Sequence, residues 1–377
     1  MDPKHRRLLR EQRERKRKAE SAPTAKAKGR YSRIYHDKYK QLLFFTFGIL
    51  LLSLLVIGHT YYRTGDVFYK GVSLSGGITI TIPVGETPVE LRELETTLKE
   101  RFPENDLVVR EIAEFGRQQG ITIEAKTADN SRESLEELAD GIIAQMSLQV
   151  PTAANDASKE ITGPALGDAF FRQTFKALLV AFVSMGLVVF IYFGETKTQK
   201  ALVTLLSIVE AFLIWNASGA FTIIFGIIGA IALIIMYLRY SIPSTAVILA
   251  AFSTLTFTVA VLNIMQMRLS TAGVAALLML LGYSVDTDIL LSTRVLKSTS
   301  GTVYERIVST VKTGLTMTGT TFVAAMIALI FTQSDVIREI MTIVVIGIIG
   351  DIFFTWVQNS GILRMYLEKK GRGSDDA

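Results

Sequence analysis

Acidic side chains stand inside several long apolar stretches of this 377-residue chain. Asp286 and Asp288 fall within the run Leu269–Leu296, Asp351 falls within GIIGDIFFTW, and Glu210 falls within a shorter apolar run. A charged side chain at the centre of a bilayer costs at least about 2.5 kcal/mol, so acids in such positions usually serve ion or proton pathways. These residue types therefore predict the loading and release of an ion inside a membrane.

Two plainer interpretations of these acids stay open. Asp286 and Asp288 can end a helix in the headgroup layer, because Arg294 follows Asp286 after about 12 Å of helix. Asp351 and Glu210 can each form a hydrogen bond between helices in a protonated or paired state.

Small and hydroxyl side chains crowd the segment 313–321. Thr316 and Thr320 lie one helical turn apart, so they would share a helix face and could line a polar path opposite Asp286. Such residues also let helices pack closely and hydrogen-bond across an interface, which is the plainer interpretation of the cluster.

The apolar runs that hold these residues belong to a larger set. Hydrophobic residues make up 49% of the chain, and eight runs approach the length needed to cross about 30 Å of hydrocarbon. The runs cover residues 41–58, 174–193, 201–215, 221–238, 244–262, 269–291, 315–331 and 340–363. We expect a polytopic α-helical membrane protein with about eight spans, of which 41–58 is the first and 173–366 forms the bundle.

Basic residues are unevenly distributed between the expected loops. Most of them fall in loops on one side, whereas the short loops on the other side hold chiefly Arg268 and Arg338. Because cytoplasmic loops carry an excess of lysine and arginine, this pattern predicts a cell-membrane protein with both ends in the cytoplasm. Residues 1–40 would be a basic cytoplasmic tail, either a simple anchor or a patch for anionic lipid or the ribosome, and 367–377 the C-terminal tail.

Residues 59–172 contain no run that could span a bilayer, so we expect them to fold as one extracytoplasmic domain. Alternation, capping residues and apolar spacing predict six elements. In chain order they are a strand at 72–84, a helix at 88–101, strands at 106–115 and 120–126 joined by a GRQQG turn, a helix at 131–146 and a strand at 158–162. This order predicts a ferredoxin-like α+β unit, and nothing in it suggests an active site.

Several kinds of chemistry are excluded or not expected. The chain has no cysteine, which rules out disulfides, thiol catalysis and cysteine metal sites. Its three histidines, His5, His36 and His59, are scattered, so no zinc site is expected. No GxxxxGK[ST] loop is present to hold a nucleotide. We expect neither enzyme activity nor a cofactor.

Separated motifs resemble those of the SecF family of protein-export membrane proteins. GYSVDTDILLSTRVLK is similar to the family signature in its archaeal spelling, GVSLSGG resembles the glycine-pair motif after the first span, and ITGPALG resembles the start of the second. The residues that carry these motifs are Gly71, Gly76, Gly77, Gly163, Pro164, Gly282, Tyr283 and Arg294.

The resemblance implies a six-span fold of the resistance-nodulation-division (RND) type that pairs with SecD beside the Sec translocation channel. It also implies that the outside domain helps to draw or release the translocating unfolded polypeptide, and that the ion-motive force drives this work through the bundle. Asp286 is then the best-placed acid, and the coupling ion is either a proton or sodium.

This chain departs from the family pattern in two places. Eight spans are expected where the family has six, and the extra hairpin near 194–237 enters and leaves on one side. Bacterial members place an arginine near the start of the threonine-rich span, where this chain offers Lys312. The ion-coupling candidates are therefore Asp286, Asp288, Asp351, Glu210, Lys312, Thr316 and Thr320.

Two other functions fit this sequence less well. An RND-type exporter of small molecules or lipids usually has two large outside domains on a doubled chain, whereas this chain offers one modest domain. An intramembrane aspartyl protease could use Asp286 and Asp351 as a pair of acids that share a proton. The GxGD motif typical of such proteases is absent, because Gly347 and Gly350 have a different spacing before Asp351.

Overall fold

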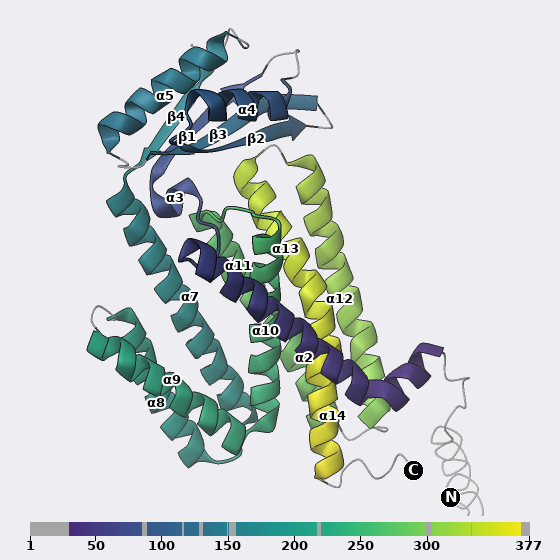
Figure 1. Cartoon of the computed structure of the whole chain (residues 1–377). Coiled ribbons are helices and arrows are strands. Elements are labelled where there is room, and N and C mark those ends of the chain that lie inside the picture. The colour runs from purple at the N-terminus through teal and green to yellow at the C-terminus, as the bar shows by residue number, and fades with distance from the viewer. Residues whose placement is uncertain are drawn as a thin grey trace, which may run out of the picture. The chain divides into compact units, whose positions relative to one another are not determined.

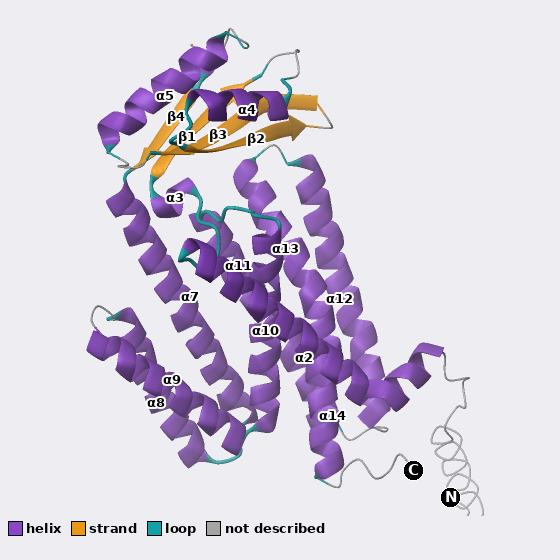
Figure 2. Cartoon of the chain, viewed as in Figure 1, coloured by secondary structure: helices purple, strands orange, loops and turns teal. Residues whose placement is uncertain are grey.

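The computed structural model describes residues 30–370, apart from 85–88, 115–116, 128–130, 149, 151–155, 217–219, 299–302 and 333. The structure is mostly helical and contains one small sheet (Figures 1 and 2). The start of the helix predicted at 88–101, most of the basic tail and the last seven residues lie outside the described residues.

Each of the eight predicted spans corresponds to helical structure (Figure 1), although the span predicted from residue 269 begins two residues later and that at 340–363 runs through three successive helical segments. The helices are α2 (Arg30–Thr64), α7 (Pro164–Phe193), α8 (Lys197–Trp215), α9 (Ala220–Tyr240), α10 (Ile242–Ile264), α11 (Thr271–Lys297), α12 (Val303–Phe331) and α13 (Asp335–Phe353), which continues through the π-helix η1 (Phe354–Asn359) into α14 (Ser360–Lys369). Within the described residues, seven helical segments are long and apolar enough to cross a membrane, and α9 adds a shorter apolar stretch at Ile224–Tyr240.

Local sequence sets the starts of these helices. Ser270 caps α11 by accepting hydrogen bonds from the amides of Ala272 and Gly273. Thr196 caps α8 in the same way, and Gly163 precedes Pro164, the first residue of α7. Because of this early start, α7 begins ten residues before the predicted span, and α12 likewise begins before residue 315.

The sheet domain follows the predicted β-α-β-β-α-β order (Figure 2). Its elements are α3 (Val72–Ser75), β1 (Gly77–Pro83), α4 (Leu91–Arg101), β2 (Asp106–Glu114), β3 (Arg117–Lys126), α5 (Arg132–Ser147) and β4 (Ser158–Thr162). The strands form an antiparallel sheet in the order β2-β3-β1-β4, with Ile80 opposite Ile123 and Thr81 opposite Thr122. The isoleucines pack with Leu94 of α4 and other apolar residues in one core, so both helices cover the same sheet face.

Two predicted boundaries in this domain were wrong. Residues 72–75 form the short helix α3 and not the start of a strand, because the chain turns at Gly76, whose φ of +81° suits glycine. The predicted GRQQG turn is shorter than expected, since β3 already begins at Arg117.

Candidate functional site

Two acids, Asp288 and Asp351, are fully buried among polar side chains in the core of the bundle. Asp351 of α13 accepts hydrogen bonds from Ser284 Oγ at 2.6 Å and Thr287 Oγ1 at 3.1 Å, both on α11. It also accepts one from Thr355 Oγ1 at 2.8 Å. Three hydroxyl donors therefore surround one carboxyl group and join α11 to α13.

Asp288 has a less complete set of partners than Asp351. Its Oδ1 accepts a hydrogen bond from Asn359 Nδ2 at 2.7 Å. Its Oδ2 and the Asn359 Oδ1 are buried and have no hydrogen-bond partner among the described residues. A buried polar atom without a hydrogen-bond partner costs about 1–3 kcal/mol of stability. A fold that keeps such atoms in its core therefore points to a functional role for them.

No described lysine, arginine or histidine forms an ion pair with Asp288 or Asp351. An unpaired charge in a low-dielectric interior is costly, so these acids must be neutralised by protons or by a bound cation. Carboxylate, amide and hydroxyl oxygens suit both roles, because they accept hydrogen bonds and are the ligands that hard cations prefer. In the described part of the chain, no group of three or more His, Cys, Asp or Glu residues forms a metal site.

The π-helix η1 begins three residues after Asp351 and supplies Thr355 and Asn359 to the cluster. Its wider turn replaces the regular α-helical hydrogen-bond pattern of the backbone next to Asp351. Short π-helical segments inside α-helices frequently occur at functional sites. The irregularity is therefore a second indication, independent of burial, that the surroundings of Asp351 are specialised.

Both acids stand out in the sequence, but their hydrogen-bond partners do not. Ser284, Thr287 and Asp288 are spaced i, i+3 and i+4, so they share one face of α11. Thr355 and Asn359 follow Asp351 by four and eight residues. The helical spacing could have indicated the hydroxyl partners from the sequence. No sequence pattern indicates the π-helix.

The structure separates Asp286 from the acid cluster. Asp286 lies on the exposed face of α11, as does Gly282 one turn earlier. A two-residue step rotates a helix by about 200°, so Asp286 and Asp288 point in nearly opposite directions. The pairing of Asp286 with Asp351 that a protease would need is absent, since Asp351 is fully buried.

The other predicted residues lie outside the acid cluster as well. Thr316 and Thr320 are exposed on α12, and their hydroxyls donate to carbonyls of their own helix. Lys312 is also exposed. Arg294 donates to Thr313 Oγ1 at 3.1 Å and thereby links α11 to α12. Glu210 is buried in α8 beside glycines of α9.

The motif glycines meet at the start of α11 and α7. The Gly71 amide donates to the Leu269 carbonyl at 2.7 Å, and a side chain at Gly71 would lie only 3.1 Å from that oxygen. A side chain at Gly76 would lie 2.6 Å from the Pro164 Cα. Two motifs far apart in the sequence therefore pack together, and this contact requires their glycines.

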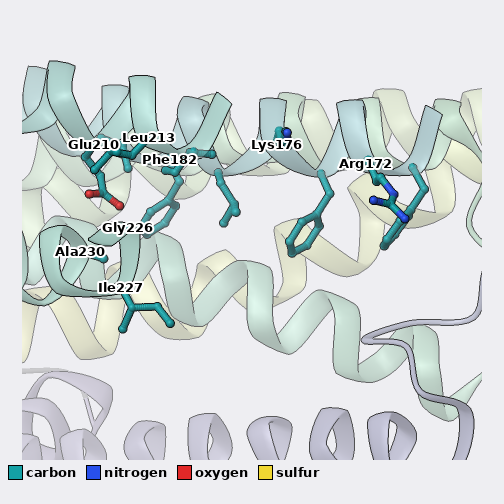
Figure 3. Close-up of a pocket in the computed structure, with 13 residues that line it drawn as sticks. Arg172, Lys176, Phe182, Glu210, Leu213, Gly226, Ile227 and Ala230 are labelled. Carbon is teal, nitrogen blue, oxygen red and sulfur yellow. The ribbon is translucent and has the colours of Figure 1, made fainter. Parts of the chain in front are cut away.

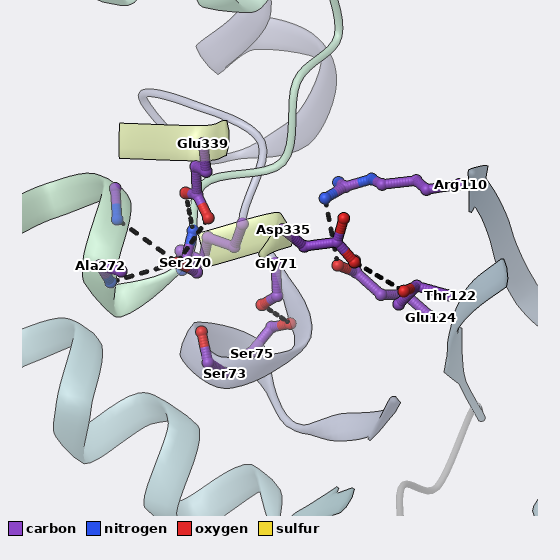
Figure 4. A network of polar contacts seen from close by, with 12 residues as sticks. Gly71, Ser73, Ser75, Arg110, Thr122, Glu124, Ser270, Ala272, Asp335 and Glu339 are labelled. Atoms are coloured by element: carbon purple, nitrogen blue, oxygen red, sulfur yellow. Dashed lines mark hydrogen bonds and ion pairs between the residues drawn. The ribbon is translucent and has the colours of Figure 1, made fainter. Parts of the chain in front are cut away.

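Carboxylates of α13 tie this junction to the sheet domain (Figure 4). Glu339 accepts hydrogen bonds from the amide and the hydroxyl of Ser270, each at 2.7 Å. One turn earlier, Asp335 accepts a hydrogen bond from Thr122 Oγ1 of β3 at 2.6 Å. The same two helices that hold the acid cluster are thus joined to each other and to the sheet at this end.

The two arginines that the sequence placed in short loops also contact the sheet domain, although Arg338 lies in the first turn of α13. Arg268 pairs with Asp106 at 2.6 Å, and Arg338 donates to the Glu111 carbonyl at 3.0 Å. Nearby, burial lowers the pKa of Lys126, and the Arg268 guanidinium lowers it further. The sequence alone indicated only that these arginines are basic residues in short loops. Their contacts could not be predicted, because the partners lie more than 150 residues away.

Comparison with known proteins gives one consistent family. Residues 213–369 match the family model for the protein export membrane protein SecD/SecF, C-terminal. The SecF protein-export membrane protein of Methanothermobacter thermautotrophicus is 30% identical over 336 residues, covering 88% of this chain and 93% of the relative. That of Pyrococcus furiosus is 29% identical over 335 residues, covering 88% and 92%.

A solved structure shares the fold. It is the crystal structure of SecDF, a translocon-associated membrane protein from Thermus thermophilus, with a TM-score of 0.53 and 17% sequence identity. The match covers 89% of this chain but only 38% of that protein. The described helices and sheet therefore share their fold with a part of that longer protein.

Proposed function

This chain belongs to the SecF family of protein-export membrane proteins, and from that premise we propose that it works with SecD to promote polypeptide translocation, driven by an ion gradient. The observation that carries the proposal is the buried acid cluster of Asp288 and Asp351. It lies on two helices, α11 and α13, that are hydrogen-bonded to each other through Ser270 and Glu339. Of these, α13 also accepts a hydrogen bond from Thr122 of the sheet domain through Asp335.

Binding of a proton or a sodium ion at the cluster would change the contacts between α11 and α13. Each charge that crosses 100 mV supplies about 2.3 kcal/mol, which can bias a two-state element if the ion favours one state. The distance along α13 from Asp351 to Glu339 is about 18 Å, short enough for a rigid helix to carry a small shift to its end. The sheet domain, joined to α13 through Asp335, would then move with it.

The exposed residues of α11 and α12 are evidence that another protein packs against this face in the membrane. Asp286 and Gly282 are exposed on α11, and Gly319 and Thr320 are exposed on α12. Side chains added at either glycine would meet nothing within 4 Å. An acid that faces lipid is costly, and small residues allow close helix approach, so a second helical bundle fits this face. We assign SecD to it.

The proposal places the sheet domain outside the cell membrane and both ends of the chain in the cytoplasm, in agreement with the loop charges. There the sheet domain would contact unfolded polypeptide that leaves the Sec channel. The basic tail would remain on the cytoplasmic side, near anionic lipid or the ribosome.

Affinity purification from native membranes, followed by mass spectrometry, tests the partnership. We expect SecD and Sec-channel subunits to co-purify, and we expect Gly282→Leu to reduce SecD recovery by blocking the exposed face. Gly48→Leu is a matched control, because a side chain there also meets nothing within 4 Å but lies on α2. Recovery of the chain alone, or equal SecD recovery with both variants, would contradict the assigned interface.

A further inference from the structure

A groove lies between α7 and the α8–α9 hairpin (Figure 3), and none of the residues that line it belongs to the acid cluster. Its volume is about 580 Å³, and most of its lining is apolar, including Phe175, Phe182, Leu213 and Ile227. Ile227 is 57% exposed, so the groove is reached from the lipid-facing side of the hairpin. The hairpin is the part of the chain that exceeds the six spans expected for the family.

The groove runs along one stripe of α7. Arg172, Lys176, Leu179 and Val183 follow one another at intervals of three or four residues and all line it. Eleven residues of helix separate the first from the last, a length of about 16 Å. That length is close to the hydrocarbon depth of one membrane leaflet, about half of 30 Å.

The two ends of the groove carry opposite chemistry, as Figure 3 shows. Arg172 is exposed, and its guanidinium has no partner among the described residues; Lys176 donates to the Trp215 carbonyl at 2.9 Å. At the other end Glu210 is 2% exposed, and its Oε2 has no partner within the described part of the chain. A side chain at Gly229 would overlap the Glu210 carboxyl, so the glycine allows Glu210 to close this end.

The cationic end lies at the level expected for a membrane surface. Trp215, at the tip of the hairpin, is 54% exposed, and tryptophan is enriched at the boundary between lipid and water. Guanidinium and ammonium groups bind phosphate by charge-assisted hydrogen bonds. We propose that the groove binds one hydrocarbon chain of an anionic phospholipid, with its phosphate group held by Arg172 and Lys176.

Bound lipid can be followed through Trp215, since the chain has only two tryptophans and the other, Trp356, is buried in the core. The protein is reconstituted with brominated phospholipids, which quench tryptophan on contact, at equal fractions of anionic and zwitterionic headgroup. We expect the anionic lipid to quench at roughly tenfold lower concentration, as the loss of a charge-assisted hydrogen bond would imply. Trp215→Phe should remove the difference between the two lipids.

Three variants decide the outcome. Arg172→Gln with Lys176→Gln should abolish the headgroup preference. Ala230→Phe, which fills the groove, should also abolish the preference and leave only the quenching by bulk lipid that reaches the exposed Trp215. Arg239→Gln removes an exposed cation of α9 that does not line the groove and should leave the preference intact. Equal quenching by both lipids in the unaltered protein would overturn the proposal. So would an unchanged preference after loss of both cations. Because the unaltered protein is itself informative, a variant that fails to fold does not block the test.

Discussion

Carboxyl groups of α13 join α11 at two levels, and the two joints are built differently. Near the sheet domain, both oxygens of Glu339 are matched by the amide and hydroxyl of Ser270, at 2.7 Å each. In the core, Asp351 accepts three hydroxyl hydrogen bonds, while the neighbouring Asp288 keeps a buried oxygen without a described partner. Both oxygens of Glu339 are matched within the chain, whereas Asp288 Oδ2 and Asn359 Oδ1 lack a described partner and could accept a proton or a cation. We therefore assign a structural role to the Glu339 contact and propose ion coupling for the Asp288–Asp351 cluster.

The largest stability effect is expected at the complete joint. Glu339→Ala leaves the amide and hydroxyl of Ser270 without their acceptor and should lower the free energy of unfolding by about 1–3 kcal/mol. Glu339→Gln keeps one carbonyl acceptor and should cost less. Denaturant titration in detergent micelles measures both values. A loss smaller for alanine than for glutamine would contradict the structural role of this joint.

A smaller effect is expected where α13 meets the sheet. Thr122→Val removes the hydroxyl that donates to Asp335 but keeps the β-branched shape, and it should cost about 1 kcal/mol. Thr81→Val is the matched control, because Thr81 lies opposite Thr122 in the neighbouring strand and forms no hydrogen bond to α13 among the described contacts. Equal losses for the two variants would show that the contact with Asp335 adds no stability.

The smallest effect is expected at the exposed ion pair beside this joint. The Arg268 side chain is 13% exposed, but that of its partner Asp106 is 60% exposed, so solvent screens the pair. Asp106→Asn should therefore cost at most about 1 kcal/mol, and the loss should shrink as salt is raised. A loss that does not depend on salt would mean that the pair acts through packing instead of charge.

Sequence patterns predicted the helices and the order of the sheet elements because hydrophobic length, caps and alternation are local properties. They could not predict which side of α11 faces inward. The spacing of Asp286 and Asp288 puts them on opposite faces, but only the packing of α13 against α11 buries Asp288 and leaves Asp286 exposed. The strand expected from residue 72 failed for a related reason, since contact with Pro164 sets the turn at Gly76.

The hydrogen-bond partners of Asp288 and Asp351 could likewise be predicted only in part from local sequence patterns. Ser284 and Thr287 were available from their helical spacing, whereas Thr355 and Asn359 depend on a π-helix that no local pattern indicates. Arg268 and Arg338 resembled ordinary loop charges because their partners, Asp106 and the Glu111 carbonyl, lie in a distant domain. Contacts between separated segments therefore set both the acid cluster and the junction.

The most direct test compares export by Asp351→Asn and Glu339→Gln in membrane vesicles, with and without an imposed ion gradient. Both changes replace a carboxyl group of α13 by an amide of the same shape. If the acid cluster couples one charge, Asp351→Asn should lose a stimulation of up to roughly fiftyfold per 100 mV. Glu339→Gln should keep its response to the gradient. An intact gradient response in Asp351→Asn would contradict the assignment of ion coupling to this cluster.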